Sequence, residues 1–190
     1  MRPRLYTTLR DPVRDCDTEP MGPIVERLHD PTSNSIADLL SESERAGLRM
    51  VRRLVGEWES GANRFDRPGE VLLGAWINGR LVGVCGLNID PYAGSERAGR
   101  VRHLYVLAAF RRRGIGGQLV RQVMEAGHAR FDDLRLRTND PAAARLYETL
   151  GFRSCPGGRD YTHVARLTTA PPPHQSPEGG TLDAPASPEL

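Results

Sequence analysis

The segment best equipped for chemistry is a basic, glycine-rich turn at residues 111–117, Arg-Arg-Arg-Gly-Ile-Gly-Gly. The apolar residues of 101–107 predict a mostly buried strand before it, and apolar spacing from Ile115 onward predicts a helix after it. The first N–H groups of a helix lack internal acceptors, and the helix dipole adds about half a positive charge there. Because glycine also lets a phosphate approach the backbone closely, the turn predicts an anion site. We expect the backbone amides to contribute most of the binding energy for the anion, because an exposed ion pair contributes about 1 kcal/mol at most. The arginines would mainly attract the anion toward the site.

Two common phosphate-binding patterns do not fit this turn. A Walker loop for ATP needs Gly-Lys-Ser/Thr, and the chain contains no lysine. A dinucleotide fingerprint needs a third glycine three positions after Gly116, where Leu119 stands. The ligand must therefore be another phosphate compound.

Two motifs, one at the turn and one downstream of it, resemble the motifs of a known family. Arg111-x-x-Gly114-x-Gly116 resembles the acyl-CoA pyrophosphate loop of the GNAT superfamily of N-acetyltransferases, written Q/R-x-x-G-x-G/A. The stretch at 136–152, Leu-Arg-Thr-Asn-Asp-Pro-Ala-Ala-Ala-Arg-Leu-Tyr-Glu-Thr-Leu-Gly-Phe, resembles the later half of that family, written N-x-x-A-x-x-L/F-Y-x-x-x-G-F. The two motifs together are specific, and the resemblance covers residues 22–167.

The resemblance implies an α/β (α+β) fold with a single domain. Its central sheet would be mixed and mostly antiparallel, with about six or seven strands splayed at the acyl-CoA site and about four flanking helices. The implied enzyme moves an acetyl group from acetyl-CoA, its co-substrate, to a primary amine of a small molecule or protein by direct attack in a ternary complex, without a metal. The residues implied for acyl-CoA binding are Val106, Leu107, Arg111, Arg112, Arg113, Gly114, Ile115, Gly116, Gly117 and Asn139.

Tyr147 is the residue to which the resemblance assigns proton transfer. It would point at the thioester sulfur and protonate the departing thiolate, and the alternative is a buried aromatic residue packed on the sheet. A backbone N–H of Val106 or Leu107 would stabilise the tetrahedral intermediate, and the same strand edge would pair with the pantetheine arm. Asn139 would reach the pantetheine or hold the loop, or else simply cap a helix.

The sequence lacks the general base that the family often carries on the strand before the turn. An alkylammonium has a pKa of about 10.4, so reaching the neutral amine at pH 7 costs about 4–5 kcal/mol. The two corresponding positions hold Arg100 and Arg102, neither of which can serve as a base. Substitutes are Glu96, Glu70, His103 or a chain of ordered waters, although His103 could instead be a surface or packing residue and Glu70 a solvated one.

The acceptor is expected between the early helices and the loops at 61–69 and 90–99. Carboxylates there would suit a cationic acceptor, although charged residues on such segments are more often simply solvated. These carboxylates are Glu57, Glu59, Asp66, Glu70 and Asp90.

The composition of the chain limits which cellular compartment and which partners we expect. With 190 residues and 38% hydrophobic content, the chain suits one domain, and it contains no apolar run of membrane-spanning length and no apolar signal core. Its cysteines, Cys16, Cys85 and Cys155, are odd in number and widely spaced, which favours a reducing cytoplasm and argues against structural zinc. With a net charge of only +2, we do not expect nucleic acid as a partner. The sequence is compatible with a homodimer.

Three regions are expected along the chain. Residues 1–21 form an N-terminal extension, with Met21 as an alternative start, and the Pro-rich segment 168–190 is a disordered tail. Between them, residues 22–167 form the catalytic domain. Its expected strands are 23–28, 70–77, 80–89, 101–107, 134–136, 152–155 and 161–167. Its expected helices begin within the stretch 30–35, at the capping-box pattern Ser41–Glu44, at Ile115 and at Pro141.

Two other functions compete with this interpretation. A non-catalytic acyl-CoA-binding module is suggested by the missing carboxylate on the central strand. A toxin-like acetyltransferase of aminoacyl-tRNA would require a basic surface beyond the turn arginines. Release of CoA thiol with a panel of amines distinguishes the enzyme from the binding module.

Overall fold

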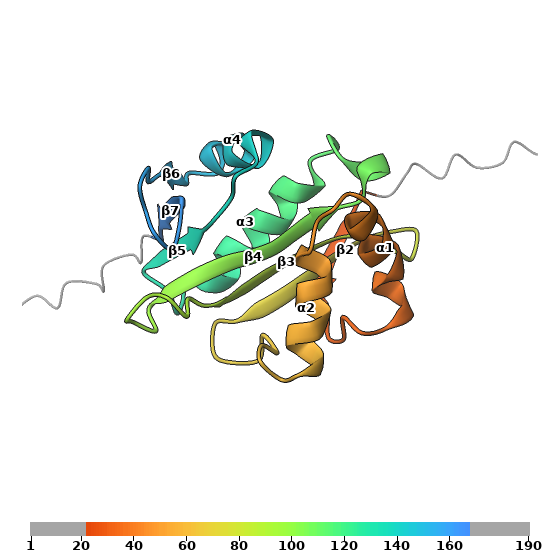
Figure 1. Ribbon diagram of the computed structural model, residues 1–190, viewed down its shortest axis with the longest axis horizontal. Helices are drawn as coiled ribbons and strands as arrows, with labels where there is room; N and C mark the ends of the chain where they lie inside the picture. Colours follow the sequence, from red (N-terminus) through yellow and green to blue (C-terminus); the bar gives the residue numbers. More distant parts are fainter. Residues whose placement is uncertain (1–21, 168–190) are drawn as a thin grey trace, which may run out of the picture.

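The computed structural model describes residues 22–167 as one seven-stranded sheet with helices on both faces (Figure 1). The strands lie in the order β1-β2-β3-β4-β5-β7-β6, and every neighbouring pair is antiparallel except β4 and β5. The expected mixed, mostly antiparallel sheet is thereby confirmed. The strands are β1 Ile24–Arg27, β2 Val71–Ile77, β3 Arg80–Ile89, β4 Ala98–Val106, β5 Asp133–Leu136, β6 Arg153–Ser154 and β7 His163–Arg166.

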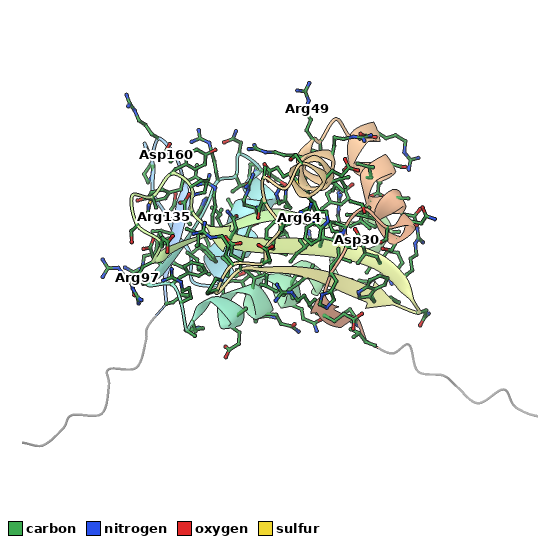
Figure 2. The ribbon with its side chains drawn as sticks, turned by 90° about the horizontal axis from the view of Figure 1, so that it is seen from below. Asp30, Arg49, Arg64, Arg97, Arg135 and Asp160 are labelled. Carbon is green, nitrogen blue, oxygen red and sulfur yellow. The ribbon has the colours of Figure 1, made fainter. Side chains whose placement is uncertain are left out.

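The helices form a layer on each side of the sheet. Figure 2 shows α1 and α2 on the face opposite α3, which packs on β2, β3 and β4. The helices are α1 Ala37–Arg45, α2 Met50–Glu59, α3 Ile115–Gly127 and α4 Pro141–Thr149, with short 3₁₀ turns η1 Asn34–Ile36 and η2 Ala108–Phe110. None of the helices within 22–167 has the length and apolar character that a bilayer crossing requires. The predicted extension, the predicted tail, Met21 and Cys16 lie outside the described residues.

The β2–β3 hairpin turns at the dipeptide Asn78-Gly79, a strong hairpin signal in the sequence. Asn78 and Gly79 join the strands with φ angles of 49° and 74°. Positive φ at both central residues is the type I′ requirement that favours Asn-Gly. The two strands contribute Leu72, Leu81, Val82 and Val84, all at most 1% exposed, to the core.

The predicted capping box at Ser41–Glu44 is wrong. These residues lie inside α1, and Ser43 is buried and donates to the carbonyl of Leu40 instead of capping a new helix. Gly47, whose φ is +70°, lies just after the end of α1, and α2 begins only at Met50. Gly61 follows the end of α2, with φ at +76° and its N–H donating to the carbonyl of Trp58.

The sheet opens between β4 and β5. These strands pair only at Ala98–Asp133, Gly99–Leu134 and Arg100–Arg135. At Gly99 a Cβ would lie 2.6 Å from the side chain of Leu134, so this paired part of β4 has no room for a larger residue. Beyond Arg100 a register shift against β3 and a φ of +56° at His103 mark a bulge in β4. One edge of β4 is consequently free of a partner strand.

Candidate functional site

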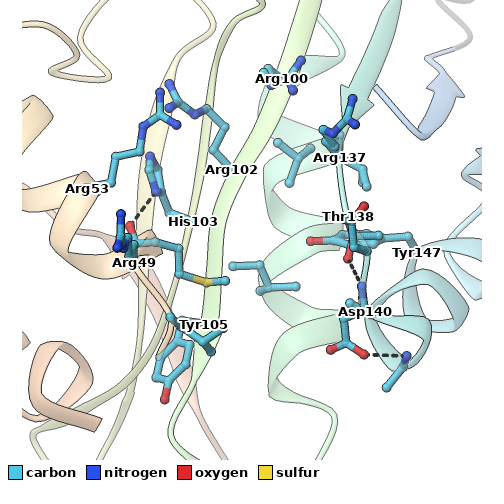
Figure 3. A pocket seen from close by; sticks show the side chains of 18 of the residues that line it. Arg49, Arg53, Arg100, Arg102, His103, Tyr105, Arg137, Thr138, Asp140 and Tyr147 are labelled. Carbon is cyan, nitrogen blue, oxygen red and sulfur yellow. Dashed lines mark hydrogen bonds between the residues drawn. The ribbon is translucent and has the colours of Figure 1, made fainter. Parts of the chain in front are cut away.

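A cavity of about 930 Å³ occupies the opening between β4 and β5. It is lined by β4, by the segment that follows β5 and by α4, and it extends to the loop between α1 and α2. In Figure 3, Arg53, Arg100, Arg102 and Arg137 gather at one end, and Tyr105 and Asp140 mark the other. The cavity therefore has two chemically different ends.

The turn before α3 presents a row of unused backbone donors. Among the described residues, no hydrogen bond engages the N–H groups of residues 112–117, whereas the N–H of Arg111 donates to Ala108. Arg112 and Gly114 both have positive φ, at 62° and 79°. Successive amides in such a conformation form a concave nest at a helix N-terminus, which fits a pyrophosphate.

The side chain of Arg111 folds back onto β4. Its Nε donates to the carbonyl of Val106 at 2.8 Å, and its guanidinium lies 5.3 Å from the centre of the Tyr105 ring. Glu42 of α1 accepts hydrogen bonds from the Tyr105 hydroxyl and from the N–H of Ala108. Arg111 thus contacts the end of the strand, although its side chain, like those of Arg112 and Arg113, is exposed.

The two candidate backbone donors on β4 point in different directions. Leu107 donates its N–H to Val82 of β3 at 2.9 Å. Val106 lies opposite Gly83, and this pair exchanges no hydrogen bonds between β4 and β3, because the neighbouring pairs on either side do so. The N–H of Val106 therefore points away from β3, toward the open edge of β4. Only the N–H of Val106 therefore faces the cavity.

Tyr147 lines this cavity from α4. Its side chain is 7% exposed and packs edge-on against Phe152, with ring centroids 5.6 Å apart. Within the described part of the chain its hydroxyl makes no hydrogen bond, and burial raises its pKa above the ordinary value for tyrosine. The hydroxyl therefore keeps its proton at neutral pH.

Asn139 is exposed and lines the cavity, but it does not cap the helix. The cap is Asp140, whose carboxylate accepts the N–H of Ala142 at 2.8 Å, with Pro141 at the first helical position. The quoted motif places its asparagine seven positions before the tyrosine, and in this chain that position is Asp140. The side chain of Asn139 is consequently available to a ligand.

Comparison with known proteins identifies the family to which this geometry belongs. The sequence profile of the "Acetyltransferase (GNAT) family" matches residues 34–152. The chain belongs to the GNAT acetyltransferase family. It is an acetyl-CoA-dependent N-acetyltransferase. The relative N-alpha-acetyltransferase RimI of Mycobacterium tuberculosis is 32% identical over 138 residues, which cover 66% of this chain and 81% of RimI.

Solved structures share the GNAT fold. A chain from Exiguobacterium sp. 255-15, described as a presumed acetyltransferase, superposes with a TM-score of 0.67 at 28% identity, over 77% of this chain and 94% of that one. The GNAT family N-acetyltransferase YhbS of Escherichia coli, solved in complex with CoA, superposes with a TM-score of 0.55 at 17% identity, covering 85% and 86% of the two chains. The second likeness is one of fold alone.

The candidate bases of this GNAT chain have different surroundings. Glu96 is exposed, pairs with Arg67 and Arg130, and lines neither cavity. Glu70, which we expected to be solvated, is 7% exposed and accepts the backbone N–H groups of Ile89 and Arg67. That expectation was wrong because the carboxylate closes the loop before β2. Neither glutamate is free to take a proton from a substrate in the main cavity.

His103 does line the main cavity, and its ring points toward α2 (Figure 3). Its Nδ1 lies 2.9 Å from the carbonyl of Met50, and its buried Nε2 lies 3.6 Å from Glu57, too far for a direct hydrogen bond. Burial lowers the pKa of His103, with Glu57 acting in the opposite direction. The imidazole is therefore neutral at pH 7.

The arginines at the other end of the cavity were not recognised from the sequence as a group. They come from separate segments: Arg49, Arg53, Arg100, Arg102, Arg137 and Arg159. Their spacing follows no motif, and only the two positions on β4 were singled out, as places where a base was missing. The sequence did contain one indication of this group, namely the large number of arginines on the segments that the fold brings together around the cavity.

The carboxylates expected to attract a cationic acceptor are mostly engaged with other groups. Glu57 binds Arg53 at 2.6 Å and Arg102 at 2.8 Å, and buried Asp90 binds Arg100 at 3.2 Å. A second cavity of about 420 Å³ lies where we expected the acceptor and shares Arg53, Arg102 and Tyr92 with the first. The expected location is thus hollow, but its wall carries more positive charge than we expected.

Proposed function

We propose that this acetyltransferase transfers the acetyl group of acetyl-CoA to a primary amine by direct attack within a ternary complex. The observation that carries the proposal is the row of unused N–H groups at 112–117 beside the open edge of β4. The amides would bind the pyrophosphate, and the pantetheine arm would run along β4 like an added strand. Asn139, exposed beside this path, would contact the arm.

In this mechanism the chain contributes two donors to the reacting thioester. The N–H of Val106 faces the open edge and would stabilise negative charge on the carbonyl oxygen. The hydroxyl of Tyr147, which is protonated at neutral pH because burial raises its pKa, would give its proton to the departing thiolate. Acetyl-CoA supplies the acyl group.

The proton of the attacking amine would leave by way of His103 or ordered water. His103 is neutral and is the one candidate base that lines the main cavity. Arg100 and Arg102 reduce the need for a strong base, because nearby positive charge lowers the pKa of an ammonium group. The absence of a carboxylate on β4 is compatible with catalysis for this reason.

The relative RimI is named an N-alpha-acetyltransferase, which supports an α-amino group as the acceptor. We place the activity of residues 22–167 in the cytoplasm, where Cys85 stays a buried thiol with a pKa raised to about 12. The mechanism works equally in a monomer and in a homodimer. The 1–21 extension and the 168–190 tail stay assignments from sequence.

Two assays on the full-length protein test the proposal. A thermal-shift titration with acetyl-CoA reports cofactor binding, and release of CoA thiol with a panel of amines reports turnover. Binding and turnover are expected together. Binding without turnover of any amine supports the non-catalytic module, and turnover restricted to aminoacyl-tRNA supports the toxin-like alternative. A folded protein that does not bind acetyl-CoA refutes the whole scheme.

A further inference from the structure

We propose that the acceptor is an anionic amine, a primary amine bearing a carboxylate or phosphate group a few bonds from its nitrogen, held by the arginines at the far end of the cavity. The inference rests on the proposed function, since it takes the amine to react at Tyr147 and Val106. We use the term arginine end for the arginines that line this cavity, of which Figure 3 shows Arg53, Arg100, Arg102 and Arg137 together at one end. The full set is Arg49, Arg53, Arg100, Arg102, Arg137 and Arg159.

The arginine end carries more positive charge than the protein neutralises. Arg100 is paired with Asp90, while Arg53 and Arg102 share the single carboxylate of Glu57. Within residues 22–167, the remaining three have no carboxylate within 4.0 Å: Arg49, Arg137 and Arg159. Asp160 lines the same end, but it does not balance three free guanidinium groups. An anion is the group that completes this charge distribution.

The guanidinium groups also have donors left for a ligand. Arginine presents five N–H donors in a planar fork that matches a carboxylate or phosphate. In Arg102 the recorded bond uses Nη2 toward Glu57, and in Arg137 one Nη1 contact goes to the carbonyl of Arg159. Arg100 is held rigid by Asp90, by the carbonyl of Asp160 and by the ring of Tyr92 at 4.8 Å. A ligand anion would therefore meet partly fixed donors.

The phosphates of acetyl-CoA do not account for this end. The free amides of 112–117 lie beyond the C-terminal end of β4, whereas Arg100 and Arg102 lie where β4 leaves β5 (Figure 3). The phosphates and the thioester are at opposite ends of the pantetheine arm, so the arginine end faces the acceptor.

A nucleic acid also fits this end poorly. The side chains of Arg100 and Arg102 are only 9% and 15% exposed, withdrawn into the cavity wall. A polyanion needs arginines spread over an open surface, since its phosphates follow one another along the strand. The second hollow shares Arg53, Arg102 and Tyr92 with the first, so a compact anion at their boundary would meet both arginines.

Matched amine pairs test the inference in the CoA-thiol assay with the full chain. Each pair differs only in the anion: glycine and glycinamide, phosphoethanolamine and ethanolamine, and a dipeptide and its C-terminal amide. Anionic members should show kcat/KM about tenfold or more above their neutral partners, because charge-assisted hydrogen bonds are lost with the anion. Equal turnover of both members, or a preference for spermidine, overturns the inference while leaving the acetyltransferase activity demonstrated.

Variants then locate the anion. Arg102→Gln should raise KM for the anionic amine about tenfold relative to KM for its neutral partner, with acetyl-CoA binding unchanged. Arg137→Gln removes an exposed side chain without a carboxylate partner, so it keeps the fold intact if Arg102→Gln does not. Arg153→Gln, on the exposed edge strand β6 and outside both cavities, is the matched control. Weakened acetyl-CoA binding in the Arg102 and Arg137 variants, with amine KM unchanged, would assign these arginines to the cofactor and overturn the inference.

Discussion

At the turn before α3 the binding groups are consecutive backbone amides of one segment, whereas at the arginine end they are side chains from separate parts of the chain. The turn requires only the local conformation of residues 111–117 and the start of a helix. The arginine end requires β4, the loop between α1 and α2, and the segments flanking β5 and β7 to meet. A site of the first kind can be read in a sequence, and one of the second kind emerges only in the fold.

The difference also separates what each end recognises. Backbone amides bind the pyrophosphate common to every acyl-CoA and leave little room for variation. Side chains can change one at a time, so the arginine end is where acceptor specificity resides in our scheme. The following experiments disturb one end and leave the other as the reference.

The largest expected effect is on Tyr147, which lies between the two ends. Tyr147→Phe should lower kcat by about 10²- to 10⁴-fold, because it removes the proton donor to the thiolate and keeps the ring packed on Phe152. Stopped-flow or steady-state release of CoA thiol measures the rate. Acetyl-CoA affinity is expected to be unchanged, and full turnover in this variant would remove Tyr147 from the mechanism.

The next effect concerns the stability of the arginine end. Asp90→Asn should lower the free energy of unfolding by about 3 kcal/mol, because Arg100 keeps a buried charge without its carboxylate. Urea unfolding measures the change. The control is Asp132→Asn, whose pair with Arg97 is exposed to solvent and should contribute much less to stability. Equal losses in both variants would mean that the Asp90–Arg100 pair is not a special support of the site.

A smaller effect is expected at the turn. Gly116→Ala has room in the fold, since a Cβ there would lie 3.4 Å from Leu146, and alanine favours the helix. The variant should weaken acetyl-CoA binding by no more than a few-fold, because the loop motif accepts alanine as well as glycine at this position and the backbone amides stay in place. Calorimetry measures the affinity. Gly56→Ala in α2, where a Cβ meets nothing within 4 Å, should stabilise the helix equally and leave affinity unchanged.

The smallest effect is a pH dependence of stability at Glu57. Burial alone would raise its pKa, but His103, Arg53 and Arg102 outweigh burial and lower it from 4.5 to about 2. The folded state therefore binds the proton less well than the unfolded state, so stability from this group is complete above pH 4.5 and is lost as the pH falls toward 2. Glu57→Gln should flatten that part of the stability profile, as followed by denaturant titrations at successive pH values. An unchanged profile would contradict the pairing.

Much of the fold could be predicted because local signals were strong. Asn78-Gly79 specified the β2–β3 hairpin, and Asp140-Pro141 with Gly151 bounded α4. The start of α2 could not be predicted. Ser41–Glu44 has the composition of a capping box, but those residues already belong to the helix that packs Leu39 into the core.

The candidate site divides in the same way. The turn, Tyr147 and the β4 edge could be predicted because a motif fixes their spacing. The environment of Glu70 could not be predicted, because its burial depends on the backbone N–H of Ile89, nineteen positions away. The choice between Val106 and Leu107 likewise needed the register with β3, which the sequence does not contain.

The short contact between β4 and β5 has a mechanical consequence. Three residue pairs join a four-stranded half, β1 to β4, to a three-stranded half containing β5, β7 and β6. A ligand arm that lies along the free edge of β4 would add contacts between the two halves of the sheet. Amide hydrogen exchange in β5 and β7 should then slow when acyl-CoA is bound, which would make the cofactor a structural link between the two halves of the sheet.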